Sequence, residues 1–188
     1  MFIPLRNTAH TYGLVSQLLH WLVALLVILQ FTWAWRIQQL DPFTRARFDL
    51  VNEHKSIGAT LLALVGARLL WRLFNPPPPP PPTLAAWEQR AAATAHWLLY
   101  AVLVALPLTG WMMSSAAGYG VQWFGLFRLP DLVAQDQALL DRMQALHALL
   151  ATALAGLVSV HVLAALRHEL WKRDNVLRRM LPLWRRDR

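Results

Sequence analysis

Cysteine is absent from the whole 188-residue chain. Its absence excludes disulfide bonds, thiolate catalysis, iron–sulfur clusters and the covalent attachment of a c-type haem. Histidine, methionine and the acidic side chains are therefore the side chains left to bind a metal.

Charge is also scarce, since only 15% of the residues are charged while 56% are hydrophobic. A soluble domain of this size is less apolar. The formal net charge of +8 raises the possibility of nucleic-acid binding. A nucleic-acid-binding protein, however, gathers Lys and Arg on one folded surface or arm, and here they occur in short blocks between long apolar stretches. The sequence therefore predicts a membrane protein surrounded by lipid, with no nucleic-acid partner.

Four apolar stretches are long enough to cross the hydrocarbon core of a bilayer, which is about 30 Å thick. The first is not a cleavable signal, because it is too long and lacks a small-residue cleavage site. We predict a single all-α domain, residues 1–188, folded as an integral membrane four-helix bundle. The predicted spans are residues 14–35, 54–74, 92–117 and 143–167.

The basic residues predict the orientation of the bundle. The N-terminus, the second loop and the C-terminal tail together hold 12 of the 18 basic residues. The other two loops, with their flanks, hold six basic and six acidic residues. By the positive-inside rule both termini, including the tail of residues 168–188, are expected in the cytoplasm. The chain is thus predicted to be a multi-pass protein of the bacterial inner membrane.

Two loops have distinctive compositions. The cytoplasmic linker, residues 75–83, contains seven consecutive prolines at positions 76–82. Such a run forms a stiff spacer of about 22 Å, and we favour a plain strut over a docking site for a proline-binding module. The longest outer loop, Gly118 to Arg142, has glycine- and aromatic-rich stretches that indicate a re-entrant or interfacial segment.

Seven histidines stand out in so apolar a chain, because polar side chains inside a membrane are costly and usually functional. His147 and His161 are 14 residues apart on the fourth predicted helix. At about 100° and 1.5 Å per residue, they lie on nearly the same face and about 21 Å apart along the axis. This spacing suits two stacked cofactors, one near each membrane face.

Two further histidines match these by depth. His54 opens the second predicted span at the outer face, as His147 opens the fourth. His20 lies about six residues inside the first span from the cytoplasmic end, and His161 about six residues before the fourth span ends. We therefore pair His54 with His147 and His20 with His161. Two neutral imidazoles on opposite sides of a haem iron form a closed site suited to electron transfer.

Simpler interpretations exist for each of these histidines. A single histidine in a bundle is more often a hydrogen-bonded packing residue than a ligand. Four that agree in depth and in helix face favour haem ligation. A zinc site needs three or four ligands within about 2 Å of one ion, which two separated pairs do not offer.

Several other side chains are candidates for contacts with the cofactors. Arg68 is 14 residues past His54, and we expect it to pair with propionates of the inner haem. Lys55 or Arg36 would do so for the outer haem. Anchoring by the positive-inside effect explains Arg72 equally well.

Two more histidines lie near the predicted cytoplasmic face. His168 follows His161 by seven residues, on nearly the same face and about 10 Å nearer the cytoplasm, and His96 starts the third span at a similar depth. Both suit hydrogen bonding and proton relay to a quinone head group, or a role as ordinary interfacial histidines. Trp171 and Lys172 follow in the same region and complete the predicted quinone contacts.

In several motifs the sequence resembles the bacterial cytochrome b561 family of small di-haem membrane proteins, which includes superoxide oxidase. The matching residues run along nearly the whole chain: His20-Trp21-Leu22, His54 with Gly58, Arg68 to Arg72, the proline-rich loop, Ala95-His96 through Tyr100 to Pro107, Gly110-Trp111, His147, His161, His168, and the tail from Trp171 to Pro182. The resemblance implies His20, His54, His147 and His161 as axial ligands of two non-covalent haem b groups. More distantly, the histidine scheme is similar to the cytochrome b subunits that anchor hydrogenases and formate dehydrogenases.

For the superoxide oxidase branch, the resemblance further implies oxidation of periplasmic superoxide with ubiquinone as electron acceptor. A basic outer rim would steer this anion, but six acidic residues cancel the six basic ones there in formal charge. We hold two alternatives: a cytochrome b subunit or quinol-linked carrier that serves a periplasmic redox partner, and a haem-free bundle such as an assembly factor or transporter.

Overall fold

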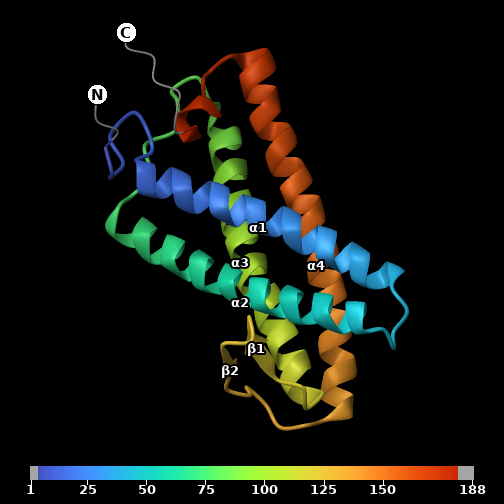
Figure 1. The fold of residues 1–188 in the computed structure, drawn as a ribbon. Helices are drawn as coiled ribbons and strands as arrows, with labels where there is room; N and C mark the ends of the chain where they lie inside the picture. The colour runs from blue at the N-terminus through green and yellow to red at the C-terminus, as the bar shows by residue number, and fades with distance from the viewer. Residues whose placement is uncertain (1–3, 182–188) are drawn as a thin grey trace.

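Four long helices make up most of the protein (Figure 1). The structure is a computed structural model, and it describes residues 4–181. Each of the four helices is long and apolar enough to cross a membrane, so the predicted all-α membrane bundle is confirmed. The helices are α1 (Leu14–Gln39), α2 (Arg45–Phe74), α3 (Ala86–Ala116) and α4 (Gln137–Arg167).

The helices pack in chain order, α1 on α2, α2 on α3 and α3 on α4. In the view of Figure 1 the α1–α2 hairpin crosses the α3–α4 hairpin. We call the end formed by residues 4–13, 75–85 and 168–181 the inner end, and the end formed by residues 40–44 and 117–136 the outer end. The four histidines paired above all lie on these helices.

Helices α2 and α4 start before the predicted spans, because polar caps begin them rather than the edge of the apolar stretch. Thr44 accepts a hydrogen bond from the Arg47 amide and begins α2. Asp136 accepts one from the Leu139 amide and begins α4. Helices that start with such caps carry a polar first turn out of the hydrocarbon layer. As a result, His54 lies nine residues inside α2 and His147 ten residues inside α4, which keeps their depths matched.

The core is an apolar layer at mid-height of the bundle. Leu154, only 2% exposed, lies midway between His147 and His161 on α4. The layer separates the two levels at which the histidines occur. Its buried members come from all four helices: Val23, Val27, Leu61, Val65, Tyr100, Leu103 and Leu154. Large apolar side chains outside it, such as Ile28 and Leu163, both 65% exposed, lie on surfaces that suit contact with lipid.

The outer loop contains a short β-hairpin that the sequence analysis did not predict. Strands β1 (Val121–Trp123) and β2 (Phe127–Leu129) pair antiparallel. Between them the backbone turns through Phe124 and Gly125, at φ 48° and 73°, a left-handed conformation in which glycine is unstrained. The turn reverses the chain within three residues, so the loop folds back on the bundle.

Two hydroxyl groups of α2 hold this hairpin. Ser56 is only 2% exposed. Its hydroxyl lies 2.8 Å from the Asn52 carbonyl and 2.9 Å from the Gln122 carbonyl. The same hydroxyl accepts a hydrogen bond from the Phe124 amide at 2.9 Å. The Trp123 indole donates to the Thr60 hydroxyl at 3.0 Å. The hairpin is therefore fixed over the part of α2 that follows His54.

The tail folds back at the inner end after a π-helical turn, His168–Lys172. Left-handed residues Arg173 and Asn175 then reverse the chain, and a 3-10 turn, Arg178–Met180, follows. Its Met180 carbonyl accepts a hydrogen bond from the Trp21 indole at 2.8 Å. Residues 182–188 of the predicted tail, including Pro182 of its motif, lie outside the described residues.

The inner end is also tied to the proline-rich linker. The Asn7 side-chain amide donates to the carbonyls of Asn75 and Pro76, at 3.0 Å each. The Arg179 guanidinium donates to the Pro79 carbonyl at 3.0 Å and to the His10 carbonyl at 2.8 Å. The N-terminal segment, the linker and the tail thus form one connected layer.

Replacing Ser56 with Ala tests the attachment of the hairpin. The substitution leaves the Gln122 carbonyl and the Phe124 amide without their hydroxyl partner, and the loss of such a hydrogen bond typically costs about 0.5–1.5 kcal/mol of stability. We expect a lower midpoint of thermal unfolding and faster proteolysis within residues 120–130. Thr152→Ala, which removes an exposed hydroxyl bonded only to the Ala148 carbonyl, is the control. Equal stability of the two variants would contradict this role for Ser56.

Candidate functional site

Histidine rings meet in two places in the bundle. Those of His54 and His147 lie 6.5 Å apart between centroids, with their planes inclined at 71°. Those of His20 and His161 lie 6.2 Å apart at 69°. We call these the outer pair and the inner pair. In each pair the two rings come from different helices that are not neighbours in the chain.

Both separations match the space for one metal ion between two imidazoles. A metal–imidazole bond is about 2.0 Å long and the nitrogen lies roughly 1.1 Å from the ring centre, so two opposed ligands have centroids about 6.2 Å apart. Edge-to-face rings in direct contact span about 4.5–7 Å, so what points to ligands is that the same spacing recurs at two separate levels. No group of three or more His, Cys, Asp or Glu side chains is arranged to hold a metal ion among residues 4–181, so the geometry fits paired ligands and not a zinc site.

The tautomer of His147 follows from its hydrogen bonds. Its Nδ1 lies 3.0 Å from the Thr109 hydroxyl and 3.1 Å from the Leu106 carbonyl. The Thr109 hydroxyl donates to that same carbonyl at 2.7 Å. A carbonyl oxygen only accepts, and the one hydroxyl proton is used, so Nδ1 must carry the proton. The other ring nitrogen, Nε2, is then unprotonated and able to bind a metal.

The partner histidines have an unsatisfied ring nitrogen. Within the described part of the chain, Nδ1 of His20 and Nδ1 of His54 are buried and have no hydrogen-bond partner. Buried polar atoms are nearly always paired, so each of the two sites contains an imidazole that lacks a partner within the protein.

Glycines on the helix faces have different surroundings. A Cβ at Gly58 would lie 3.0 Å from the Gln30 side-chain nitrogen, and that amide donates to the His54 carbonyl at 3.0 Å. Gly58 therefore makes room for Gln30 rather than for a cofactor. Gly156, between the two α4 histidines, is exposed and has nothing within 4 Å of a Cβ.

His96 lies beside the inner pair. Its ring centroid is 5.4 Å from that of His161, with the planes at 64°. The sequence analysis had placed it with His168 as a quinone contact. The structure separates these two residues, because His168 is held in the tail by other contacts.

Arg68 lies next to the inner histidines and is half-buried. Its charge acts on His20, His96 and His161. The guanidinium lies over the Tyr100 ring, 5.5 Å from its centroid, and none of the carboxylates in the described residues pairs with it. An unpaired, half-buried cation beside the inner pair is suited to bind an anionic group.

A small cavity of about 30 Å³ adjoins Arg68 on the inner side. Burial raises the pKa of the Tyr12 phenol there, against the opposing effect of the arginines around it. Tyr12 therefore stays a neutral hydrogen-bond donor at physiological pH. The cavity is lined by polar and aromatic side chains, among them Asn7, Tyr12, Ser16, Arg68, Trp71 and Tyr100.

Lys55 lies near the outer pair. Its charge acts on His54, and its ammonium group lies 5.9 Å from the centre of the Tyr119 ring and 3.4 Å from the Gly120 carbonyl. Arg36, the alternative in the sequence analysis, is exposed in the last turn of α1. The structure therefore connects Lys55, and not Arg36, with this site.

The remaining predicted quinone contacts lie in the tail and are engaged by carboxylates. Nδ1 of His168 lies 2.6 Å from an Asp174 oxygen, and Asp174 is only 3% exposed. Lys172 binds both oxygens of Glu88 at 2.6 Å, and Arg167 binds one of them at 3.1 Å. Trp171 is 79% exposed. The Glu88 bridge ties the start of α3 to the end of α4.

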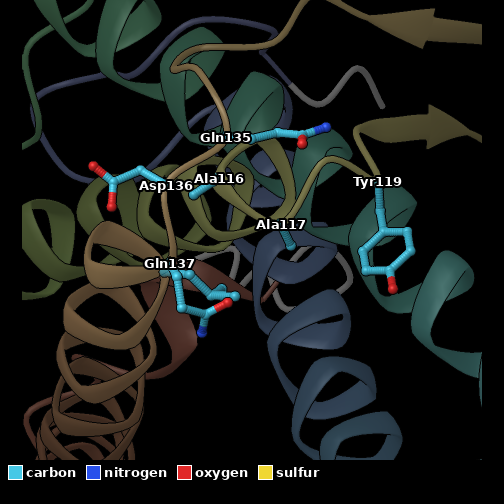
Figure 2. Close-up of a pocket in the computed structure, with 7 residues that line it drawn as sticks. Ala116, Ala117, Tyr119, Gln135, Asp136 and Gln137 are labelled. Atoms are coloured by element: carbon cyan, nitrogen blue, oxygen red, sulfur yellow. The ribbon is translucent and has the colours of Figure 1, made fainter.

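A cavity of about 380 Å³ opens at the outer end (Figure 2). It lies beyond the outer pair, between the end of α3 and the start of α4. In Figure 2 Tyr119 lies on one side of it and Gln135 to Gln137 on the other. Through Tyr119 it adjoins Lys55. Its lining residues are Ala116, Ala117, Tyr119, Gln135, Asp136, Gln137 and Leu140.

Comparison with known proteins agrees with this arrangement. Residues 11–183 match the family model described as prokaryotic cytochrome b561. The chain belongs to the prokaryotic cytochrome b561 family. Cytochrome b561 homolog 2 of Escherichia coli K12 is 35% identical over 178 residues, 93% of each chain. The probable superoxide oxidase CybB of Yersinia pestis is 34% identical over 173 residues, 91% of this chain and 96% of that one.

The family fixes the general character of the protein. Members bind haem b, and the chain is a membrane electron-transfer protein of the bacterial inner membrane. The paired rings and the free Nε2 of His147 fit such a group.

Sequence reasoning missed several residues that support the site. Thr109 and the Leu106 carbonyl lie in an uncharged stretch where nothing marks them as partners of His147. Asp174 and Glu88 are the acidic partners of tail and α4 cations. Glu88 had one signal: it is the only acidic residue between Glu53 and Asp131.

Proposed function

We propose that the chain binds two haem b groups and acts as a superoxide:ubiquinone oxidoreductase. His54 and His147 would hold the haem near the periplasmic face, and His20 and His161 the one near the cytoplasmic face. The observation that carries this proposal is the presence of two histidine pairs with the spacing of axial ligands, on either side of the apolar layer. The family supports haem b, and the Yersinia relative's name suggests the substrate.

When bound, a haem whose iron has two axial imidazoles exchanges single electrons and has no open position for oxygen to bind. The protein's part is to keep the two sites apart and dry. The apolar layer around Leu154 and Val65, which are 2% and 0% exposed, excludes water between the two levels. The Nδ1 proton of His147, donated to the Thr109 hydroxyl and the Leu106 carbonyl, holds this ring in the tautomer that would bind iron.

The reaction balances without a further oxidant. Two superoxide anions each lose one electron and become dioxygen, and one quinone takes both electrons with two protons to become quinol. No catalytic acid or base is required at the outer end. Protons are required only at the inner end.

Charge placement at the outer end favours an anionic substrate. Asp49 pairs with Arg45 and Asp131 with Arg128. Glu53 accepts from the Trp33 indole and Asp136 caps α4. Among the described residues no carboxylate pairs with Lys55, so the cation nearest the outer pair is uncompensated. It adjoins the open cavity, where it can attract superoxide.

At the inner end we assign Arg68 to the propionates of the inner haem and His96 to the quinone. His96 lies beside His161 and is placed to hydrogen-bond a head group. His168, which is paired with Asp174, would exchange protons with the proposed quinone site. Lys172 and Trp171 would lie at the edge of this site.

The distribution of basic residues gives the proposed orientation of the bundle in the membrane. The inner end, with 12 of the 18 basic residues on its side of the chain, faces the cytoplasm by the positive-inside rule. The outer cavity and hairpin then face the periplasm. Superoxide and quinone would meet opposite ends of the protein.

Histidine substitutions test the assignment of ligands. In His161→Ala the inner site loses one axial ligand, and we expect the purified protein to retain half of the wild-type haem. His147→Ala should also retain half of the wild-type haem. The low-spin absorption bands that remain should then be those of the inner haem, whereas those that remain in His161→Ala should be those of the outer haem. His10→Ala is the control, since His10 is exposed at the surface. Full haem content in either of the first two variants would contradict the pairing.

Pulsed superoxide tests the substrate. We expect oxidised wild-type protein, with ubiquinone present, to be reduced near the diffusion limit, with a rate that falls as salt increases. Lys55→Gln should slow this reaction roughly three- to tenfold and weaken its salt dependence. Arg45→Gln, at an exposed arginine already paired with Asp49, should leave it unchanged.

Slow reduction of the wild-type protein by superoxide would contradict the proposed substrate. With the haems retained, that result would favour the alternative of a carrier that serves a periplasmic redox partner.

A further inference from the structure

Of the four paired histidines in the described residues, His147 is the one whose ring is hydrogen-bonded to a side chain of another helix. This hydrogen bond helps to fix its tautomer. The Thr109 hydroxyl on α3 lies 3.0 Å from His147 Nδ1 on α4. Thr109 is 6% exposed, so water does not replace this contact. By contrast, Nδ1 of His54 and of His20 have no partner in the described residues.

The contact is part of a closed triangle. The Thr109 hydroxyl donates to the Leu106 carbonyl at 2.7 Å, and that carbonyl also lies 3.1 Å from His147 Nδ1. The hydroxyl proton is therefore directed away from the imidazole, and its lone pairs face the Nδ1 proton. Thr109 thus adds a second acceptor to the one that Leu106 supplies.

Backbone packing restricts the same ring. A Cβ at Gly110 would lie 3.2 Å from His147 Cε1, closer than an ordinary contact. The bare backbone next to Thr109 lets the imidazole lie against α3. Together, Thr109 and Gly110 determine where the ring lies and how it is turned.

We propose that Thr109 is a positioning residue that tunes one of the two haem sites and leaves the other unaffected. It acts through His147: two acceptors on Nδ1 make the opposite nitrogen a stronger donor to iron, which favours the oxidised metal. The proposal rests on the proposed binding of haem by His54 and His147, and it does not depend on the substrate. The two sites would then differ in reduction potential because of the Thr109 hydroxyl on α3.

The test uses the full-length purified protein with Thr109→Val, which keeps the shape and removes the hydroxyl. In a redox titration we expect the outer haem to become easier to reduce, with the ferrous-to-ferric ratio at fixed potential rising roughly three- to tenfold. The inner haem should titrate as in the wild type. The low-spin EPR signal of the outer haem should also shift as the ring loses its restraint.

Two further variants separate positioning from packing. Thr109→Ser keeps the hydroxyl and should restore the wild-type titration. Thr152→Val removes a hydroxyl one turn from His147 that bonds only the Ala148 carbonyl, and it should change nothing. If valine at 109 destabilises the protein, Thr109→Ala, which also removes the hydroxyl, tests the proposal in its place, and the serine variant is its control.

An unchanged titration in Thr109→Val, an equal shift of both haems or a shift toward harder reduction would overturn the inference. A wild-type protein without paired haem signals would overturn the proposed function instead. The haem content, measured first on the same preparations, keeps the two failures distinguishable.

Discussion

Imidazole rings inside an apolar bundle impose the main constraint on this protein. A buried ring nitrogen without a partner is unfavourable, and a bilayer offers no water to satisfy it. Here two rings face each other at each of two levels, spaced as ligands of one ion. The helix lengths, the crossing of the two helical hairpins and the apolar layer between the levels all serve to hold these four side chains in register.

The two ends of the bundle differ in construction around this shared core. At the outer end a β-hairpin is attached to α2 by Ser56 and Thr60, beside an open cavity and the uncompensated Lys55. At the inner end the tail, the linker and the N-terminal segment form a layer joined by Arg179 and by the Glu88 bridge. An open outer end with the uncompensated Lys55 and a layered inner end suit the proposed roles of collecting a small anion outside and handling protons and quinone inside.

Much of this arrangement could be predicted from the sequence. Apolar length gave the four helices, and the spacing of the histidines predicted that His54 approaches His147 and His20 approaches His161, as the rings do. Their role as haem ligands stays a prediction. Helices α2 and α4 start before the predicted spans, because Thr44 and Asp136 act as caps where hydropathy has already fallen.

Other features depend on contacts between distant segments that no periodicity reveals. The hairpin arises from left-handed turn residues and from hydroxyls on α2. The position of Gly58 reflects Gln30 on a neighbouring helix rather than a cofactor. His96 and His168 seemed equivalent from their depth, but the tail carries Asp174, which holds His168 away from the inner pair.

The number of haems per chain tests the central claim most directly. We predict that the purified protein contains two haem b groups per polypeptide by pyridine haemochrome analysis. Its reduced-minus-oxidised spectrum should show two low-spin components of different potential. A single haem per chain, or a spectrum of one high-spin species, would contradict the account of two histidine pairs.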